Sequence, residues 1–413
     1  MSDKTVVLLG TLDTKGAEYQ YLRERLELGG VRVLLVDVGT LEPPRARPDI
    51  SRQEVAAAGG VDLEALTAAR DRGRAVSEMA DAAAVIVRRL FDEGRCDGVL
   101  AAGGSGNTAI ATRAMRALPV GVPKLMVSTM AAGNTRDYIG ASDIALMASV
   151  TDVAGINSIS ARILANAAAA MAGMVNAPPV ELSEQRPLIA ATMFGVTTPS
   201  VTAAREDLEE RGYEVLTFHA TGTGGRAMEA LVESGFVTGV LDITTTELAD
   251  ELVGGVLSAG PERLEMAGRL GVPQVVSLGA LDMVNFGARD TVPPQFETRN
   301  LYIHNPSVTL MRTTPEESAE LGRQIARKLS AARGPVALFI PLRGVSAISG
   351  EGGPFYDAAA DAALIRALRE NIGKNVEVHE IDAHINDPEF ARAMAAKLDE
   401  YMKVRPRPGS TFT

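Results

Sequence analysis

Short apolar runs recur along the chain, and four of them end in a loop of glycine and hydroxyl residues that opens a helix. In the first half these runs are Val6–Gly10 and Gly98–Ala102, and in the second half they are Leu188–Gly195 and Gly239–Ile243. Apolar runs alternate with helical patterns through nearly the whole chain. This alternation is typical of a mostly parallel sheet covered by helices on both faces, so the pattern predicts an α/β protein.

The two halves share one layout, which predicts two Rossmann-like domains with mostly parallel sheets and a cleft between them. Val6–Thr40 and Leu188–Gly225 each begin with a strand, a polar loop, a helix that ends in glycine, and a second strand. Asn176–Pro187, rich in proline and polar residues, separates the halves and suits a linker. We therefore expect a nucleotide-binding domain over residues 1–180 and a ligand-binding domain over residues 186–405.

Composition narrows the class of protein. The 413 residues leave room for two buried cores, and 46% hydrophobic with 23% charged residues is ordinary for a soluble protein. A net charge of −11 argues against binding to nucleic acid or to an anionic membrane. The single cysteine, Cys96, excludes an internal disulfide framework. No stretch is expected to reach membrane-spanning length, so we expect a cytoplasmic protein.

The loop Gly103–Thr108 is the strongest candidate for phosphate binding in the first half. Its glycines allow close approach to the backbone, and the N-terminus of the following helix favours an anion. The loop is neither a Walker A motif nor a strict dinucleotide fingerprint, and a tight turn without a ligand could have the same composition. The predicted cofactor contacts in this loop are Gly103, Gly104, Ser105, Gly106, Asn107 and Thr108.

A second predicted part of this site follows the first strand, at the edge of a parallel sheet where ligands collect. Lys15 could neutralise phosphate charge, and Asp13 could reach a bound Mg²⁺ ion. The alternative is that Asp13 or Thr14 simply caps the following helix. The predicted cofactor contacts after the first strand are Gly10, Thr11, Asp13, Thr14 and Lys15. Thr129, which follows a later strand, is the last predicted contact.

Polar side chains follow nearly every apparent strand of the second half, and the exits of parallel strands share one edge of the sheet. Thr244 and Glu247 also fit a capping box, which alone could explain their motif. His219 and His304 lie at such exits and are candidate general bases, although any single histidine is more often structural. The predicted substrate contacts are Thr221, Thr223, Thr244, Thr245, Glu247, Asp282, Arg343 and His384.

An ordered set of motifs resembles one known family. The motifs are Gly-Thr-Leu-Asp-Thr-Lys (10–15), Ala-Gly-Gly-Ser-Gly-Asn-Thr (102–108), Tyr-Ile-Gly-Ala-Ser-Asp (138–143), His-Ala-Thr-Gly-Thr-Gly-Gly-Arg-Ala-Met-Glu (219–229), Asp-Ile-Thr-Thr-Thr-Glu (242–247), Gly-Ala-Leu-Asp-Met-Val-Asn-Phe (279–286) and His-Ile-Asn-Asp (384–387). They resemble the ATP-binding family typified by the N-terminal region of the tomato mosaic virus resistance protein. The resemblance covers nearly the whole chain. It implies two Rossmann-like domains, ATP with Mg²⁺ bound in the first, and a homodimer or homotetramer.

Carried over to this chain, the resemblance places the nucleotide at the loops Asp13–Lys15 and Gly103–Thr108. Asn107 departs from the family pattern, in which a glycine occupies this position. Because asparagine tolerates positive φ better than other non-glycine residues, we expect the shape of the loop to persist. The virus-binding role of the plant protein is not expected to transfer, because it concerns one partner rather than the shared site.

Two classes of function fit these expectations. The first is an enzyme that transfers a phosphoryl or nucleotidyl group, in which Lys15 and Mg²⁺ screen the phosphate charge while His219 or His304 acts as the base. The second is a non-catalytic sensor or partner subunit that the nucleotide stabilises. In the first class we expect a small polar metabolite to bind across the cleft between the domains. A nicotinamide-dependent enzyme is a weaker alternative because a dinucleotide fingerprint is lacking.

Overall fold

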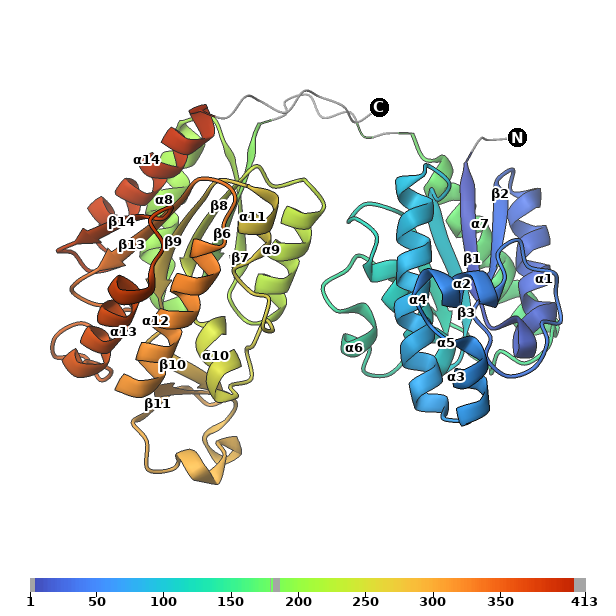
Figure 1. Cartoon of the computed structure of the whole chain (residues 1–413), viewed down its shortest axis with the longest axis horizontal. Coiled ribbons are helices and arrows are strands. Elements are labelled where there is room, and N and C mark those ends of the chain that lie inside the picture. Colours follow the sequence, from blue (N-terminus) through green and yellow to red (C-terminus); the bar gives the residue numbers. More distant parts are fainter. Residues whose placement is uncertain (1–3, 179, 181–185, 405–413) are drawn as a thin grey trace. The chain divides into compact units, whose positions relative to one another are not determined.

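In the computed structural model the chain forms two compact units, Met1–Glu181 and Leu182–Thr413, which we call the first and the second domain (Figure 1). The structure describes residues 4–178, 180 and 186–404. Each domain is built on a parallel sheet, so the prediction of an α/β fold with two mostly parallel sheets is confirmed. The predicted linker, Asn176–Pro187, lies partly outside the described residues.

The first domain contains a five-stranded parallel sheet in the order β2-β1-β3-β4-β5. Its strands are β1 (Thr5–Gly10), β2 (Arg32–Asp37), β3 (Gly98–Gly103), β4 (Lys124–Ser128) and β5 (Ala145–Ala148). Every residue of β1 and β3 is buried, which explains why these central strands are continuous apolar runs in the sequence. β2 pairs with one edge of β1, and the later strands β3, β4 and β5 lie beyond its other edge.

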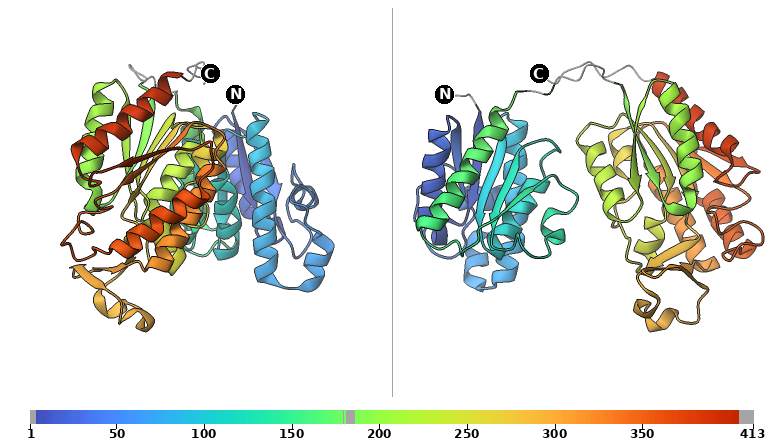
Figure 2. Two further views of the ribbon diagram at one scale, coloured as in Figure 1. Left: turned by 60° about the vertical axis from the view of Figure 1, so that its left-hand side comes forward. Right: turned by 180° about the vertical axis from the view of Figure 1, so that it is seen from behind.

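Helices cover both faces of this sheet (Figure 2). Side chains of α1 and α7 fill one hydrophobic core, and side chains of α2, α4 and α5 fill the other. The helices are α1 (Leu12–Leu28), α2 (Arg52–Ala58), α3 (Leu63–Ala69), α4 (Arg72–Asp92), α5 (Ser105–Arg116), α6 (Arg136–Ile139) and α7 (Ser158–Asn176).

The expectation that no stretch reaches membrane-spanning length was wrong. Among the described residues α7 alone is long and apolar enough, by length and composition, to cross a membrane. Its 19 residues are rich in alanine and methionine. In the structure Leu164, Ala168 and Met171 of this helix are buried in the core of the first domain, so its apolar character has a packing role.

The second domain contains a six-stranded parallel sheet in the order β14-β13-β9-β8-β6-β7. Its strands are β6 (Leu188–Met193), β7 (Glu214–His219), β8 (Gly239–Thr244), β9 (Gln274–Gly279), β13 (Val336–Pro341) and β14 (Glu377–Ile381). A separate three-stranded antiparallel sheet has the order β10-β12-β11. Its strands are β10 (Met283–Phe286), β11 (Leu301–Asn305) and β12 (Val308–Arg312).

Helices also cover both faces of the second parallel sheet. Side chains of α8 and α14 pack on one face, and those of α9 to α13 form the cores of the other. The helices are α8 (Thr198–Glu210), α9 (Thr223–Glu233), α10 (Glu247–Val253), α11 (Met266–Leu270), α12 (Pro315–Ser330), α13 (Ala358–Asn371) and α14 (Pro388–Val404), with 3₁₀ turns η1 (Gly195–Thr197), η2 (Arg289–Thr291) and η3 (Pro294–Phe296).

Candidate functional site

The strand order of the first domain brings the two predicted nucleotide loops together. β1 and β3 are neighbours, and the chain leaves them toward opposite sides of the sheet. Ligands of doubly wound sheets bind at this switch point, outside the carboxyl ends of the strands. The loops that begin at Gly10 and Gly103 both lie there. Thr129, at the end of β4, donates its backbone N–H to the Gly103 carbonyl at 3.2 Å and so lies at the same edge.

The N-terminus of α5 presents backbone donors that have no acceptor in the described part of the chain. Gly104 is the N-cap residue, and no side chain caps the helix. Among the described residues, no group accepts a hydrogen bond from the backbone N–H of Ser105, Gly106 or Asn107, whereas that of Thr108 bonds to Gly104 at 2.9 Å. Such donors, aligned with the helix dipole, favour an anion.

The buried hydroxyl of Tyr19 forms hydrogen bonds that hold the end of β3 before this loop. β1 and β3 pair only as far as Leu8 and Leu100, and beyond this point the hydroxyl of Tyr19 lies between the two strands. It can donate to the carbonyl of Leu9 at 2.7 Å or of Ala102 at 2.9 Å, and it accepts from the Ala102 N–H at 2.9 Å. Burial raises the pKa of this phenol, so it stays neutral.

Asn107 is held by the same hydroxyl. Its Nδ2 donates to Tyr19 at 2.8 Å and to the carbonyl of Ala102 at 2.9 Å. Asn107 is an ordinary residue of the α5 helix with negative φ, so its tolerance of positive φ plays no part in the shape of this segment. Gly10 has a steric role, since a Cβ there would lie 2.0 Å from the Tyr19 ring. Sequence reasoning missed Tyr19, which reads simply as a residue of a helix.

The predicted metal ligand, Asp13, is turned into the protein and is 1% exposed. Its Oδ2 accepts from the Leu41 N–H at 2.9 Å, and its Oδ1 has no hydrogen-bond partner. The neighbouring Asp37 accepts from Leu12 at 3.1 Å and from Gly39 at 2.9 Å. Burial raises the pKa of Asp37, and the charge of Asp13 acts in the same direction. No group of three or more acidic, histidine or cysteine side chains among the described residues could hold a metal ion.

The β1 exit also carries Lys15, Thr11 and Thr14. The ammonium of Lys15 donates to the carbonyl of Val153, in the loop that precedes α7. The hydroxyls of Thr11 and Thr14 lie 3.2 Å apart, and Thr11 gives no side-chain cap to α1. Lys15 and Thr14 are at least partly exposed, so their side chains lie at the surface of the predicted nucleotide site.

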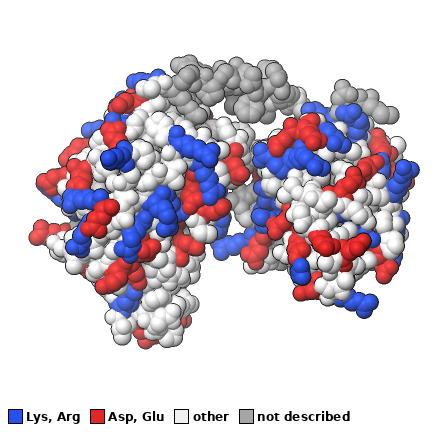
Figure 3. Space-filling model, in the orientation of Figure 1, with Lys and Arg blue, Asp and Glu red and all other residues white. Residues whose placement is uncertain are grey.

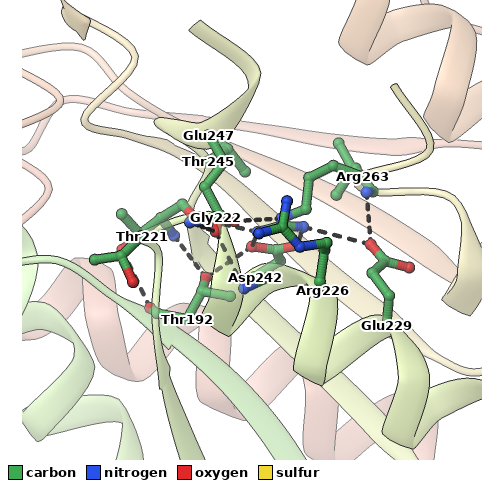
Figure 4. Close-up of polar contacts among 12 residues, drawn as sticks. Thr192, Thr221, Gly222, Arg226, Glu229, Asp242, Thr245, Glu247 and Arg263 are labelled. Carbon is green, nitrogen blue, oxygen red and sulfur yellow. Dashed lines mark hydrogen bonds and ion pairs between the residues drawn. The ribbon is translucent and has the colours of Figure 1, made fainter. Parts of the chain in front are cut away.

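In the second domain the predicted glycine loop is already filled by a carboxylate (Figure 4). Oε1 of Glu247 accepts from the backbone N–H of Gly222 at 2.6 Å and of Gly225 at 3.1 Å. The predicted capping box of Thr244 with Glu247 was wrong, because α10 starts after Thr246 and Glu247 turns to this loop instead. Thr223 is the first residue of α9, next to the filled loop.

One buried arginine joins three carboxylates in this network. Arg263 is 1% exposed, and its Nε donates to Glu247 at 2.7 Å while Nη2 donates to Asp242 at 2.7 Å. Glu229 lies 3.6 Å away and accepts from two backbone N–H groups of the loop after Arg263. Burial raises the pKa of Glu229, against the charge of Arg263. No sequence pattern indicated Arg263, because a loop arginine is ordinarily exposed.

Thr244 and Thr245, two predicted substrate contacts, are fully buried between strands. The hydroxyl of Thr244 donates to the Thr192 carbonyl at 3.1 Å, and that of Thr245 donates to the Ser277 carbonyl at 3.1 Å. Thr221 is half-buried, and its hydroxyl donates to the carbonyl of His219 at 3.3 Å. These hydrogen bonds within the protein indicate a structural role for the three threonines. Their contact with a substrate stays a prediction.

The two candidate general bases do not share an edge of one sheet. His219 ends β7, at an edge of the parallel sheet, whereas His304 lies in β11 of the antiparallel sheet. The expectation that His304 follows a parallel strand was therefore wrong. The sequence of β11 cannot reveal this, because a short apolar segment has the same pattern in either kind of sheet.

The remaining predicted contacts meet around the loop after β13. Oδ2 of Asp282 accepts from the Ser346 hydroxyl at 2.7 Å, while burial raises the pKa of Asp282 to about 6 against the charge of Arg312. His384 lies against the same loop, because its Nε2 donates to the carbonyl of Ser346 at 2.9 Å. Its Nδ1 accepts from the N–H of Asn386 at 3.1 Å, so both ring nitrogens bond to the protein.

Arg343 lies at the start of this loop, where its guanidinium forms two hydrogen bonds of 2.7 Å with Asp382. A cavity of about 370 Å³ lies elsewhere in the second domain and is lined by none of the predicted site residues. Its lining is Leu338, Ile340, Leu368, Arg369, Ile372, Val378 and Glu380.

Comparisons with known proteins place the chain in a family. Residues 4–179 match the N-terminal domain, and residues 186–402 the C-terminal domain, of the uncharacterised protein family UPF0261. The chain belongs to this family. A UPF0261 protein of Clostridium tetani is 53% identical over 402 residues, which cover 97% of this chain and 100% of the relative.

The predicted resemblance to the tomato protein is confirmed at the level of the family. The ToMV resistance protein Tm-1(GCR237) of Solanum lycopersicum is 41% identical over 425 residues, which cover 97% of this chain and 56% of the tomato protein. A solved UDP-N-acetylglucosamine 2-epimerase aligns over 100% of both chains at 13% identity with a TM-score of 0.25, a likeness too low to carry an argument.

Proposed function

We propose that this protein binds Mg²⁺-ATP at the switch point of its first domain and a small polar molecule in its second domain. The observation that carries the nucleotide proposal concerns the backbone N–H groups of Ser105, Gly106 and Asn107. They have no acceptor among the residues that the structure describes, and they lie beside the exit of β1. A phosphate is the ligand that such a helix terminus favours. The motifs shared with the tomato protein's family supply the choice of ATP among phosphorylated ligands.

The residues present fit the phosphates of a nucleotide better than they fit a metal cage. Asp13 supplies one unpartnered carboxylate oxygen, and the described residues offer no larger ligand group. Mg²⁺ in nucleotide sites is often held by one or two carboxylates together with phosphate oxygens and water. We therefore propose that Mg²⁺ arrives with the nucleotide and neutralises phosphate charge, and that the buried carboxylate of Asp13 contacts it through water.

Turnover of the nucleotide is a further proposal, in which Lys15 screens developing phosphate charge and a histidine accepts a proton. A specific observation favours the alternative of a non-catalytic sensor or partner subunit. Glu247 and His384, two predicted substrate contacts of the second domain, already bond to the protein with their carboxylate and imidazole groups. Under this alternative the nucleotide stabilises a homodimer or homotetramer.

The proposal is tested by calorimetric titration of the whole protein with ATP, ADP and NAD, with and without Mg²⁺. We expect Mg²⁺-dependent ATP binding, and loss of most of that affinity in Lys15→Ala with an unchanged circular dichroism spectrum. Lys4→Ala is the matched control, because Lys4 lies just before β1, at the opposite edge of the sheet, and pairs with Asp97 at 3.0 Å. Absence of binding by every nucleotide would overturn the proposal, and unchanged affinity in Lys15→Ala would overturn the role of Lys15.

A further inference from the structure

The three-stranded antiparallel sheet of the second domain ends in β11, whose outer side has no partner strand among the described residues (Figure 1). On its inner side, the Arg312 N–H of β12 donates to the carbonyl of Asn300 at 2.9 Å. Because bonded and non-bonded pairs alternate along an antiparallel ladder, Tyr302 also bonds to β12, while Leu301 and Ile303 turn their N–H and C=O groups outward. No backbone group of the described residues bonds to these outward groups.

This edge lacks the charges that commonly protect an exposed strand. Ile303 is 60% exposed and Tyr302 is 36% exposed. No Asp, Glu, Lys or Arg occurs between Arg299 and Arg312, in a chain with 23% charged residues. The edge strands of the parallel sheet, β7 and β14, each contain glutamate. Charges on an edge strand oppose its pairing with another chain, and β11 has none.

The register of β11 specifies the strand that fits its outer side. β11 follows β12 regularly through Ile303, and a bulge lies between Ile303 and Asn305. A bulge bends the strand and disrupts the ladder, so the regular outward positions are Leu301 and Ile303. When two identical strands pair antiparallel about a twofold axis, Leu301 of each copy meets Ile303 of the other, and the Tyr302 residues lie opposite each other. Every outward group then has a partner, and no like charges meet.

We propose that two copies of the chain associate through β11, so that their antiparallel sheets join edge to edge with Tyr302 at the centre. The pairing satisfies the outward backbone groups of both strands and adds apolar and aromatic cross-strand contacts, which stabilise sheets. So short a contact forms a small interface, and we therefore expect weak association that increases with protein concentration. This inference does not depend on the proposed nucleotide site.

The first test is sedimentation velocity of the whole protein over a range of concentrations, without nucleotide. We expect the wild type to shift from monomer toward dimer as the concentration rises. Ile303→Lys should weaken dimerisation by about tenfold or more, because it places a charge where Leu301 of the other copy lies. Val378→Lys is the matched control, since Val378 is a partly exposed apolar residue of the edge strand β14, and it should dimerise like the wild type.

Two results of this measurement would overturn the proposal. One is a wild type that stays monomeric at every concentration. The other is a dimer that Ile303→Lys weakens no more than Val378→Lys does, because the contact would then lie on another surface. Neither result bears on nucleotide binding, which calorimetry measures separately.

The second test is a cross-link at the centre of the pair. Opposed residues that share no backbone hydrogen bond have Cα atoms about 4.5 Å apart, a separation that a disulfide can span. Tyr302→Cys should therefore give a covalent dimer under mild oxidation and Val378→Cys should not, while the native Cys96 is buried. Equal cross-linking of the two variants would overturn the proposed pairing. Because Tyr302 also packs edge-on against Phe355, sedimentation of Ile303→Lys stays decisive should Tyr302→Cys not fold.

Discussion

Helices α5 and α9 both begin after a glycine N-cap, and neither has a side-chain cap from its own first turn. At α9 the carboxylate of Glu247 reaches across from another helix and accepts from two backbone N–H groups, at 2.6 and 3.1 Å. At α5 no described residue accepts from the first three N–H groups of the helix. The two domains thus use similar loops in opposite ways.

The comparison shows that a glycine-rich loop before a helix is not by itself evidence of a ligand-binding site. Glu247 lies 25 residues beyond Gly222 in the sequence, and only the fold brings the two together. Where the protein supplies its own anion, the loop becomes part of the core, and Arg263 fixes that anion in place. Where it supplies none, the N–H groups stay available. Acidic and basic side chains are interspersed over the visible face of both domains, so the difference is local (Figure 3).

The largest expected effect on stability comes from removing Glu247, the carboxylate that fills the loop before α9. Glu247→Ala should lower the free energy of unfolding by about 3–5 kcal/mol, because it removes one of the carboxylates that accept from the buried Arg263 and leaves two backbone N–H groups without an acceptor. Urea denaturation followed by circular dichroism measures this change. Glu251→Ala, at an exposed position of the same helix, is the control and should cost less than about 1 kcal/mol. A loss in Glu247→Ala no larger than in the control would contradict the filling role.

A second effect concerns pH and Asp250, a buried residue of the helix that also carries Glu247. Burial raises the pKa of Asp250 to about 7, against hydrogen bonds from Asn285 and Leu257. A raised carboxyl pKa means that the folded state binds the proton more tightly than the unfolded state. This contribution to stability is therefore complete below about pH 4 and is lost as the pH rises through 7.

Between pH 5 and 8 the loss from Asp250 should amount to roughly 3 kcal/mol. Urea denaturation at several pH values measures it, and Asp250→Asn should flatten the profile because it cannot titrate. Asp282, whose pKa burial raises to about 6, has the same sign and should leave a residual slope in that variant. Stability of the wild type that rises over this range, or an identical slope in Asp250→Asn, would be inconsistent with this assignment.

The next effect concerns the support of the free loop. Tyr19→Phe should lower the free energy of unfolding by about 2 kcal/mol, because it leaves the Ala102 N–H and one of the two N–H groups of the Asn107 amide without a buried acceptor. Tyr21→Phe is the matched control. Its hydroxyl makes one bond, to the carbonyl of Ala161 at 3.1 Å, and its loss should cost about 1 kcal/mol or less. Equal losses in the two variants would show that the Tyr19 hydroxyl does not hold the strands.

Much of the fold was predictable because the central parallel strands are buried on both faces. The apolar run Val6–Gly10 corresponds to β1 (Thr5–Gly10), and Gly239–Ile243 corresponds to β8 (Gly239–Thr244). Burial on both sides demands apolar residues at every position, and this signal is legible without a structure. The antiparallel strand β11, which is mostly exposed, carries no such signal, and His304 was consequently assigned to the wrong kind of sheet.

The candidate site was predictable only in part. The sequence placed both polar segments correctly at strand ends that share one switch point. It was wrong to make them loops, because Asp13–Lys15 lie in the first turn of α1 and Ser105–Thr108 in the first turn of α5. It could not show which N–H groups already have partners, because Glu247, Tyr19 and Arg263 act on loops that are distant in the sequence. Side-chain partners of this kind depend on tertiary packing rather than on local pattern.

The smallest expected effect on stability comes from filling the free loop as Glu247 fills the other. Ser105→Asp places a carboxylate in the first turn of α5, where the helix dipole favours it. Its free energy of unfolding should rise by about 0.3–1 kcal/mol, measured by urea denaturation. Ser105→Asn is the neutral control of similar size and should not show this gain. A destabilised Ser105→Asp variant would mean that the terminus is not open to an anion.

The central claim is that the N-terminus of α5 binds the phosphates of a nucleotide, and calorimetric titration of Ser105→Asp with Mg²⁺-ATP tests it most directly. The account predicts that this variant is folded and at least as stable as the wild type but loses ATP binding, whereas Ser105→Asn still binds. Wild-type affinity for ATP in Ser105→Asp would contradict the account, because an ATP phosphate and the new carboxylate cannot both occupy the same N–H groups.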